Sequence, residues 1–197
     1  MTDEKDLIRR AGQGDGDAFR RLVEAYQTPV YRLALRMCGG DAALAEDAAQ
    51  EAFVAAWRGL PRFRGDSRFS TWLYRLTTNA AIDCLRREKR HRGADDLEDV
   101  DLPDGGDGPQ EAAERAETQD AVRRALALLS DEHRQVLLLR YMQELDYGEI
   151  AAALQVSEGT VKSRINRAKA RLQALLSEGG NLSSAASVKT AGEEGQP

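Results

Sequence analysis

Hydrophobic residues recur along most of this chain with the spacing of a helix. Apolar positions three or four residues apart lie within about 60° to 80° of arc on one helix face. Two such stripes are Val161, Ile165, Ala168 and Leu172, and, further upstream, Leu73, Leu76, Ala80 and Cys84. Long alternating runs of β-branched residues are absent from the sequence. The pattern therefore predicts an all-α fold.

Two polar segments divide the helical pattern. Residues 93–117 are acidic, interrupted by glycine and proline, and nearly free of large apolar side chains. Such a segment cannot bury enough surface to become ordered, so a flexible acidic linker is predicted, becoming helical near Pro109. A polar run at residues 177–197 is predicted to be a disordered tail. Two small helical domains remain, residues 1–92 and 118–176.

The net charge of −5 conceals an uneven distribution. Residues 1–92 hold 17 basic and 13 acidic side chains, and residues 120–197 hold 10 of each. Residues 93–119 hold 1 basic and 10 acidic side chains. The acidity therefore lies in the linker, and both flanking domains remain compatible with nucleic acid.

The C-terminal domain is predicted to contain three helices. Ser130 or Asp131 would cap the first, Asp146 would begin the second, and Ser157 would cap the third after the turn "LQVS". Two short helices separated by a tight turn predict a helix-turn-helix.

The third of these helices carries five basic residues and no acid between Thr160 and Leu172. Opposite its apolar stripe lie small and polar side chains, with cations on both flanks. That arrangement favours a helix in a DNA major groove, where cations reach phosphates and the polar centre faces bases. A solvated basic face is the alternative, but the cap and the short preceding helix favour DNA binding.

The run "GTVKSRINRAKARL" resembles the recognition helix of bacterial RNA polymerase sigma factors, especially the extracytoplasmic-function group. The resemblance implies that this helix reads the −35 promoter element. It implies that Arg140 and Arg164 hold phosphates. The full implied set of −35 contacts is Arg140, Thr160, Lys162, Ser163, Arg164, Asn166 and Arg167.

The segment from Asp41 to Trp57 is predicted to be a helix with two different faces. One face carries mostly small side chains: Leu44, Ala45, Ala48, Ala49, Ala52, Ala55 and Ala56. The other is a stripe of Asp47, Gln50, Glu51 and Val54, which an ordinary polar surface could also explain. The run "AEDAAQEAF" resembles the sigma-factor helix that docks on the clamp of the polymerase β′ subunit. The implied polymerase contacts are Asp47, Gln50, Glu51 and Phe53.

Residues 57–92 hold 10 basic and 3 acidic side chains. A helical stripe of arginine and asparagine bordered by aromatic residues suits strand-separated DNA, because cations follow the backbone and aromatics stack on bases. Trp57, Phe69 and Trp72 are expected in the core instead. "FRGDSRFSTWLYRLTTNAAIDCLRR" resembles the sigma-factor segment that opens the −10 element and captures a flipped base. The predicted −10 contacts are Phe63, Arg64, Gly65, Asp66, Ser67, Arg75, Asn79 and Arg86.

Catalysis, metal binding and membrane insertion find no support in the sequence. Cys38, Cys84, His91 and His133 lack metal-ligand spacing, and no catalytic constellation or cofactor motif is present. No apolar run has membrane length, and "MTDEKDLIRR" lacks the apolar core of a signal peptide. A cytoplasmic protein without enzymatic activity is predicted.

The resemblance also implies the partners. They are core RNA polymerase (its β′ clamp and β flap), promoter DNA as duplex and as melted non-template strand, and an anti-sigma factor. Association with the nucleoid is expected in the active state, and retention at the membrane through the anti-sigma factor in the inactive state. The chain itself is expected to make no membrane contact.

The predicted function is that of an alternative sigma factor, which binds core polymerase, directs it to −10 and −35 elements and promotes melting. Two other functions are alternatives. A stand-alone regulator would bind duplex DNA by itself, and an adaptor would use its basic faces on acidic proteins. The order of "AEDAAQEAF", "FRGDSRFSTWLYRLTTN" and "GTVKSRINRA" along the chain favours the sigma factor.

Overall fold

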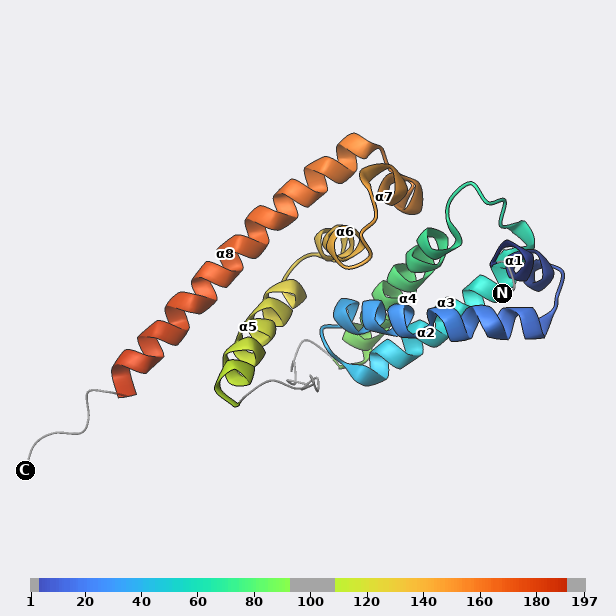
Figure 1. The fold of residues 1–197 in the computed structure, drawn as a ribbon. Coiled ribbons are helices and arrows are strands. Elements are labelled where there is room, and N and C mark those ends of the chain that lie inside the picture. The colour runs from blue at the N-terminus through green and yellow to red at the C-terminus, as the bar shows by residue number, and fades with distance from the viewer. Residues whose placement is uncertain (1–3, 93–108, 191–197) are drawn as a thin grey trace, which may run out of the picture.

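The computed structural model describes residues 4–92 and 109–190, with side chains described for residues 4–90 and 118–177. Every regular element in those ranges is a helix, which confirms the all-α prediction (Figure 1). In chain order they are α1 (Glu4–Gly12), α2 (Gly16–Met37), α3 (Ala42–Gly59), the 3-10 turn η1 (Leu60–Arg62), α4 (Phe69–Arg92), α5 (Pro109–Ala127), α6 (Asp131–Tyr141), α7 (Tyr147–Leu154) and α8 (Glu158–Thr190).

Helices α1 to α4 form the N-terminal domain, in which α3 packs against both α2 and α4. Its face toward them consists of alanines without exposed surface: Ala45, Ala48, Ala52 and Ala56. Such small side chains let neighbouring helices approach closely. Ala55 is exposed, so the small buried face is narrower than predicted. The reason is that Ala55 lies about 100° around the helix from Ala56.

Side-chain caps begin the helices of both domains. In the N-terminal domain, Asp15 accepts hydrogen bonds from the backbone nitrogens of Asp17 and Ala18, both at 3.0 Å, at the start of α2. Asp41 accepts from the nitrogen of Leu44 at 3.0 Å at the start of α3. These bonds satisfy backbone donors that a helix leaves without partners in its first turn.

The C-terminal domain confirms the three predicted helix starts. Ser130, rather than Asp131, caps α6 through the nitrogen of His133. Asp146 and Glu149 form a reciprocal capping box at α7, with bonds of 2.7 and 3.0 Å. Ser157 accepts from the nitrogen of Thr160 at 3.1 Å and so caps α8.

A tight turn between α7 and α8 completes the helix-turn-helix. Gln155, with φ of 55°, ends α7 in the left-handed conformation. The apolar stripe of α8 then faces the core, because Val161, Ile165 and Ala168 have at most 1% of their surface exposed. This confirms the predicted face for these three residues, while Leu172, its fourth member, is half-buried.

One of the two segment boundaries differs from the sequence-based expectation. Helix α5 begins at Pro109, where the linker was expected to become helical, and proline suits a first helical position. The rest of that linker, residues 93–108, lies outside the described residues. Helix α8 continues to Thr190, where a disordered tail from residue 177 was expected. The segment contains no proline before Pro197, and an established helix extends more readily than a new one forms.

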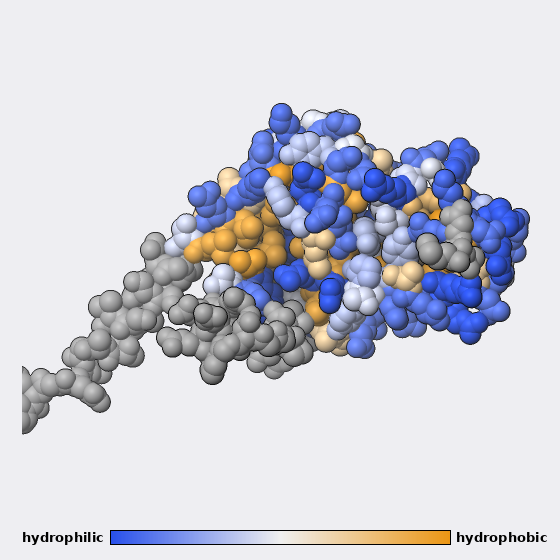
Figure 2. Space-filling view, in the orientation of Figure 1, coloured by the Kyte–Doolittle hydropathy of each residue, from blue (hydrophilic) through white to orange (hydrophobic). Residues whose placement is uncertain are grey.

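The two domains lie against each other rather than apart (Figure 1). Helix α6 contacts α2 and α4, and α7 contacts α4. The exterior of the N-terminal domain is mainly hydrophilic in Figure 2, while an apolar patch is visible on the C-terminal domain.

Replacement of Ile165 by alanine should lower the free energy of unfolding by about 2–4 kcal/mol, because a fully buried side chain leaves a cavity. Urea unfolding followed by circular dichroism would measure it. Asn166→Ala, at the exposed neighbouring position, is the matched control and should change it by less than about 0.5 kcal/mol. Equal effects of the two substitutions would contradict the burial of this α8 face.

Candidate functional site

The outward face of α8 presents the residues predicted to read bases. Lys162, Asn166 and Arg167 are exposed, and Ser163 is partly exposed. Lys169 and Arg171 are exposed on the flanks. Thr160 differs, because its hydroxyl lies 2.8 Å from that of Ser157 at the helix start. The geometry thus supports a groove-reading face over about two turns.

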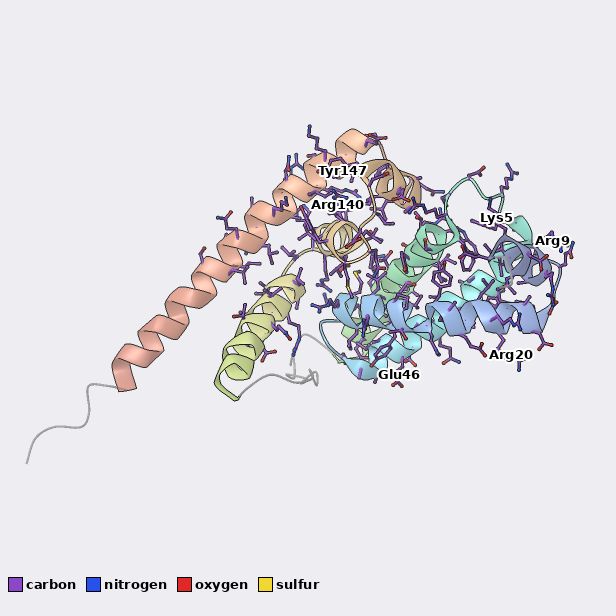
Figure 3. The ribbon with its side chains drawn as sticks, viewed as in Figure 1. Lys5, Arg9, Arg20, Glu46, Arg140 and Tyr147 are labelled. Carbon is purple, nitrogen blue, oxygen red and sulfur yellow. The ribbon has the colours of Figure 1, made fainter. Side chains whose placement is uncertain are left out.

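The two arginines predicted to hold phosphates are engaged inside the C-terminal domain. Arg140 donates to the carbonyl oxygen of Leu145 at 2.8 Å, and its guanidinium lies 5.5 Å from the ring centroid of Tyr147 (Figure 3). Arg164 forms an ion pair of 3.2 Å with Glu132 of α6. Arg164 lies about 60° from the centre of the buried stripe, so its side chain reaches α6.

Two tyrosines next to this face were not singled out from the sequence. Tyr141 is 56% exposed and Tyr147 is 38% exposed. The ammonium of Lys169 lies 5.1 Å from the ring centroid of Tyr141, and the hydrogen bond with Tyr141 raises the pKa of Lys169. Lys169 therefore stays charged beside the recognition face. The available signal was the stretch "RYMQELDY", in which one tyrosine ends α6 and the other begins α7.

In the loop between η1 and α4, the predicted −10 residues differ in how far their side chains are exposed. Arg64, Gly65 and Asp66 are exposed, and Gly65 has φ of 78°, a conformation that favours glycine. The Phe63 ring instead packs inward, with its centroid 4.9 Å from that of Trp72. Phe63 thus anchors the loop in the aromatic cluster, and Arg64 to Ser67 form its accessible part.

A hollow of about 620 Å³ lies between this loop, η1 and α1. Its walls include Arg64, Gly65, Ser67 and Arg68 from the loop side and Ile8 from α1. A concave site with backbone groups, cations and an apolar wall suits a planar, polar-edged ligand such as a nucleobase.

Helix α4 carries the remaining predicted −10 residues. Asn79 and Arg86 are exposed, and Arg75 is partly exposed. Among the aromatics expected in the core, Phe69 is buried at 5% exposure and Trp57 is 37% exposed. The expectation is therefore confirmed for Phe69 and wrong for Trp57, whose ring packs on Phe19 at 4.9 Å near the surface.

The predicted polymerase stripe is a continuous surface on α3. Asp47, Gln50 and Val54 are exposed. Glu51 forms an ion pair of 2.5 Å with Arg87 of α4, which fixes its carboxylate on that surface. Phe53 is separate from the stripe, since it is half-buried and lines a groove of about 980 Å³ with residues of α2 and the C-terminal domain.

Residues assigned to two different DNA elements share one cleft between the domains. Arg75 and Asn79 from α4 and Arg164 from α8 line a space of about 360 Å³. Sequence reasoning did not place them together.

The two cysteines are buried free thiols. Burial raises the pKa of Cys38 to about 12, and burial also raises the pKa of Cys84. Among the residues that the structure describes, no group of His, Cys, Asp and Glu could hold a metal ion. None of the described helices is long and apolar enough to span a membrane.

Comparisons with known protein families find a match for each of the two domains. Residues 22–91 match Sigma-70 region 2, and residues 119–172 match Sigma-70 region 4. Together these matches define a two-domain sigma factor of the sigma-70 type.

Several relatives extend the match over most of the chain. The ECF RNA polymerase sigma factor SigW of Bacillus subtilis is 36% identical over 86% of this chain and 94% of its own length. The sigma-H factor of Pseudomonas aeruginosa is 38% identical over 86% and 92%. SigM of Mycobacterium tuberculosis is 39% identical over 88% and 84%.

Solved structures show the same architecture. CnrH, in complex with the cytosolic domain of CnrY, aligns with a TM-score of 0.64 and 27% identity over 89% of this chain and 97% of its own. RpoE of Bartonella quintana, in complex with the anti-sigma factor NepR, aligns with a TM-score of 0.65 and 24% identity over 81% and 96%, a likeness of fold.

The chain therefore belongs to the extracytoplasmic-function (ECF) sigma factors of bacterial RNA polymerase. It is an alternative sigma factor, which directs polymerase to promoters, and it is not an enzyme. The sequence-based prediction of a sigma factor is confirmed over the regulator and the adaptor.

In the folded protein at pH 8, Cys38 and Cys84 should react with a thiol reagent such as Ellman's reagent much more slowly than in urea, because both are buried and their thiols are protonated. Absorbance at constant protein concentration would measure both rates. A Glu24→Cys variant, with a thiol at an exposed position, is the control for reagent access. Native cysteines reacting as fast as the thiol introduced by that substitution would contradict their burial.

Proposed function

We propose that this sigma factor reads the −35 element with α8, reads and opens the −10 element with the 63–67 loop and α4, and holds core polymerase with the exposed stripe of α3. The observation that carries the proposal is the two-sided character of α8. The buried residues Val161, Ile165 and Ala168 fix the helix, and the opposite side exposes a polar centre between cations.

Side-chain chemistry decides which residues of α8 are proposed to contact bases and which are proposed to contact phosphates. Arg167 and Lys162 can donate to guanine edges, and the Asn166 amide can pair with adenine in the major groove. Arg171 and Lys169, at the flanks, suit phosphates, which add affinity without sequence preference. Tyr147 positions Arg140 at the corner between α6 and α7, where it would meet the DNA backbone.

Opening of the −10 element requires no hydrolysis by this chain. A base removed from the stack loses stacking and pairing energy of a few kcal/mol. Contacts in the hollow behind the 63–67 loop, together with cations along α4, would offset that cost. Arg64 and Ser67 border the hollow, and Asn79 lies on the exposed side of α4.

Core polymerase binding is assigned to Asp47, Gln50 and Glu51 on α3. Their carboxylates and amide face outward beside the exposed Val54, so one surface offers both polar and apolar contacts. The ion pair of Glu51 with Arg87 reduces the side-chain freedom lost on binding.

An anti-sigma factor is the proposed regulatory partner. Of the similar solved structures, the RpoE of Bartonella quintana is in complex with the anti-sigma factor NepR, and CnrH is in complex with the cytosolic domain of CnrY. The groove of about 980 Å³ around Phe53 and Met142, between α2, α3 and the C-terminal domain, offers apolar surface for it. The active protein would be associated with the nucleoid. In the inactive state, an anti-sigma factor anchored in the membrane would hold the protein at the membrane.

Asp47→Arg should abolish co-elution with core RNA polymerase, because it places a cation on the surface where a carboxylate is proposed to bind. Size-exclusion chromatography of chain and polymerase mixed at micromolar concentration would show it. Glu24→Arg, the same charge reversal on the exposed surface of α2, is the control and should co-elute like the wild type. Co-elution of the Asp47→Arg variant with core polymerase would show that α3 is not part of the docking surface.

Arg167→Ala and Arg171→Ala should affect promoter use differently. Loss of a base contact at Arg167 should cost about 1–3 kcal/mol and relax preference at one base pair. Loss of a phosphate contact at Arg171 should weaken all sequences alike and reduce the salt slope by about 1. In vitro transcription by reconstituted holoenzyme from templates varied through the −35 region, at several salt concentrations, separates the two. Unchanged base preference in Arg167→Ala would show that Arg167 does not contact a base.

A further inference from the structure

Helix α1 forms one wall of the hollow behind the 63–67 loop. Lys5, Ile8 and Arg9 line that wall, and Arg64 lines the loop side. Lys5 and Arg9 are exposed, and Ile8 is partly buried. The promoter contacts proposed above lie on the loop, α4 and α8, and none of them is on α1. These α1 side chains nevertheless lie beside any ligand that enters the hollow.

Helix α1 and the loop are held by the same cluster of aromatic rings. The Tyr26 hydroxyl of α2 donates to the Glu4 carboxylate at the start of α1. Burial raises the pKa of Tyr26, so the hydroxyl stays protonated and able to donate. The Tyr26 ring meets that of Phe69 edge-on, with 5.3 Å between centroids. The Phe69 centroid in turn lies 6.0 Å from that of Phe63, which anchors the loop. One packed cluster therefore positions both walls of the hollow.

The other end of α1 is fixed by two further contacts. Gly12 lies so close to η1 that a β-carbon there would come within 3.3 Å of the Leu60 carbonyl oxygen. Two nitrogens of the Arg10 guanidinium donate to one carboxylate oxygen of Asp15, at 2.6 and 2.9 Å, across the turn into α2. Such charge-assisted bonds are among the stronger ones in proteins. Lys5 and Arg9 therefore extend from a backbone that is attached at both ends.

The charge of the hollow is mainly positive. Among the described residues that line it, the cations are Lys5, Arg9, Arg64 and Arg68, and the carboxylate is that of Glu4. Arg9 pairs with Asp6 at 2.6 Å, and 62% of the Arg9 side chain is exposed. Such an exposed pair is weak, so the guanidinium can exchange it for a phosphate. Cations beside an apolar wall suit a nucleotide, with its phosphate, better than an uncharged base alone.

We propose that Lys5 and Arg9 of α1 hold a backbone phosphate of the unpaired −10 strand, next to the nucleotide whose base enters the hollow beside Ile8. The inference rests on the proposed capture of a −10 base by the 63–67 loop. With the loop on one side and α1 on the other, the hollow binds base and phosphate together. A phosphate contact fixes the strand and adds affinity without reading sequence.

Holoenzyme reconstituted from the full chain and core polymerase is the sample for the binding experiment. The wild-type holoenzyme first selects a promoter from templates with randomised −35 and −10 regions. A forked form of that promoter has duplex DNA upstream and an unpaired non-template strand through the −10 element. A blunt duplex that ends upstream of the −10 element is the comparison template. Fluorescence anisotropy measures the binding of both.

Arg9→Ala should weaken binding of the forked template about tenfold, because a charged contact is lost. The salt slope should fall by about 0.7, the value of one phosphate contact on a single strand. Lys5→Ala should act in the same direction. Both variants should bind the blunt duplex and core polymerase as the wild type does, because the proposed contact is made only to the unpaired strand.

Arg20→Ala is the matched control. Arg20 is an exposed cation that pairs with Asp17 three residues away, as Arg9 pairs with Asp6. Figure 3 shows Lys5 and Arg9 at the same end of the domain as the loop, while Arg20 projects from α2 away from the loop. Arg20→Ala should bind the forked template as the wild type does. Equal binding by the Arg9→Ala and Arg20→Ala variants would overturn the proposal.

A neutral methylphosphonate, placed at one position of the unpaired strand at a time, would locate the phosphate. At one position it should weaken the wild type about tenfold and leave Arg9→Ala unaffected, because the two changes remove the same contact. Additive losses at every position would contradict a contact between Arg9 and the strand.

A free nucleotide offers the same chemistry as the unpaired strand, so it is the competitor. Deoxynucleoside monophosphates in the micromolar range should not displace the forked template, because the strand is held at several points. Displacement would assign the hollow to a free nucleotide and overturn the strand contact. If the wild-type holoenzyme selects no promoter, the proposed function fails and this inference fails with it. If a promoter is selected but Arg9→Ala and Lys5→Ala bind the fork normally, only the α1 contact is rejected.

Discussion

One buried guanidinium, that of Arg134, joins the ends of two helices from different domains. The last turn of a helix leaves carbonyl groups without partners, and these lie at the negative end of the helix dipole. Arg134 donates to such carbonyls at the end of α5 and to Met37 at the end of α2. Burial lowers its pKa, yet the carbonyl oxygens around it stabilise the charge. Lysine, with three donors on one atom, could not span the same set.

Around this junction, the fold assigns packing and recognition to opposite sides of the same helices. On α8 the buried stripe of Val161, Ile165 and Ala168 fixes which side faces outward. On α3 the alanine face does the same for Asp47 and Gln50. The helix cores thus set which side faces outward, and surface contacts such as that of Tyr147 with Arg140 then orient individual side chains.

Features controlled by neighbouring residues were predictable from the sequence, and features controlled by distant contacts were not. Helix caps at Ser130, Asp146 and Ser157, and the outward side of α8, depend on residues within one or two turns. The inward packing of Phe63 depends on Trp72, and the ion pair of Arg164 depends on Glu132. The burial of Arg134 depends on a carbonyl 97 residues away. Nothing local distinguishes such an arginine from the exposed ones.

The alanine face of α3 has a consequence for how this helix can change over time. Ala45, Ala48, Ala52 and Ala56 have no free surface, so any larger side chain there would push α2 or α4 away. The exposed positions of the outward stripe, Asp47, Gln50 and Val54, face no such steric limit, so substitutions there are constrained mainly by the partner that binds them. One side of the eighteen-residue helix α3 can therefore accept substitutions that match changes in a partner surface. The other side must keep its alanines for the domain to fold.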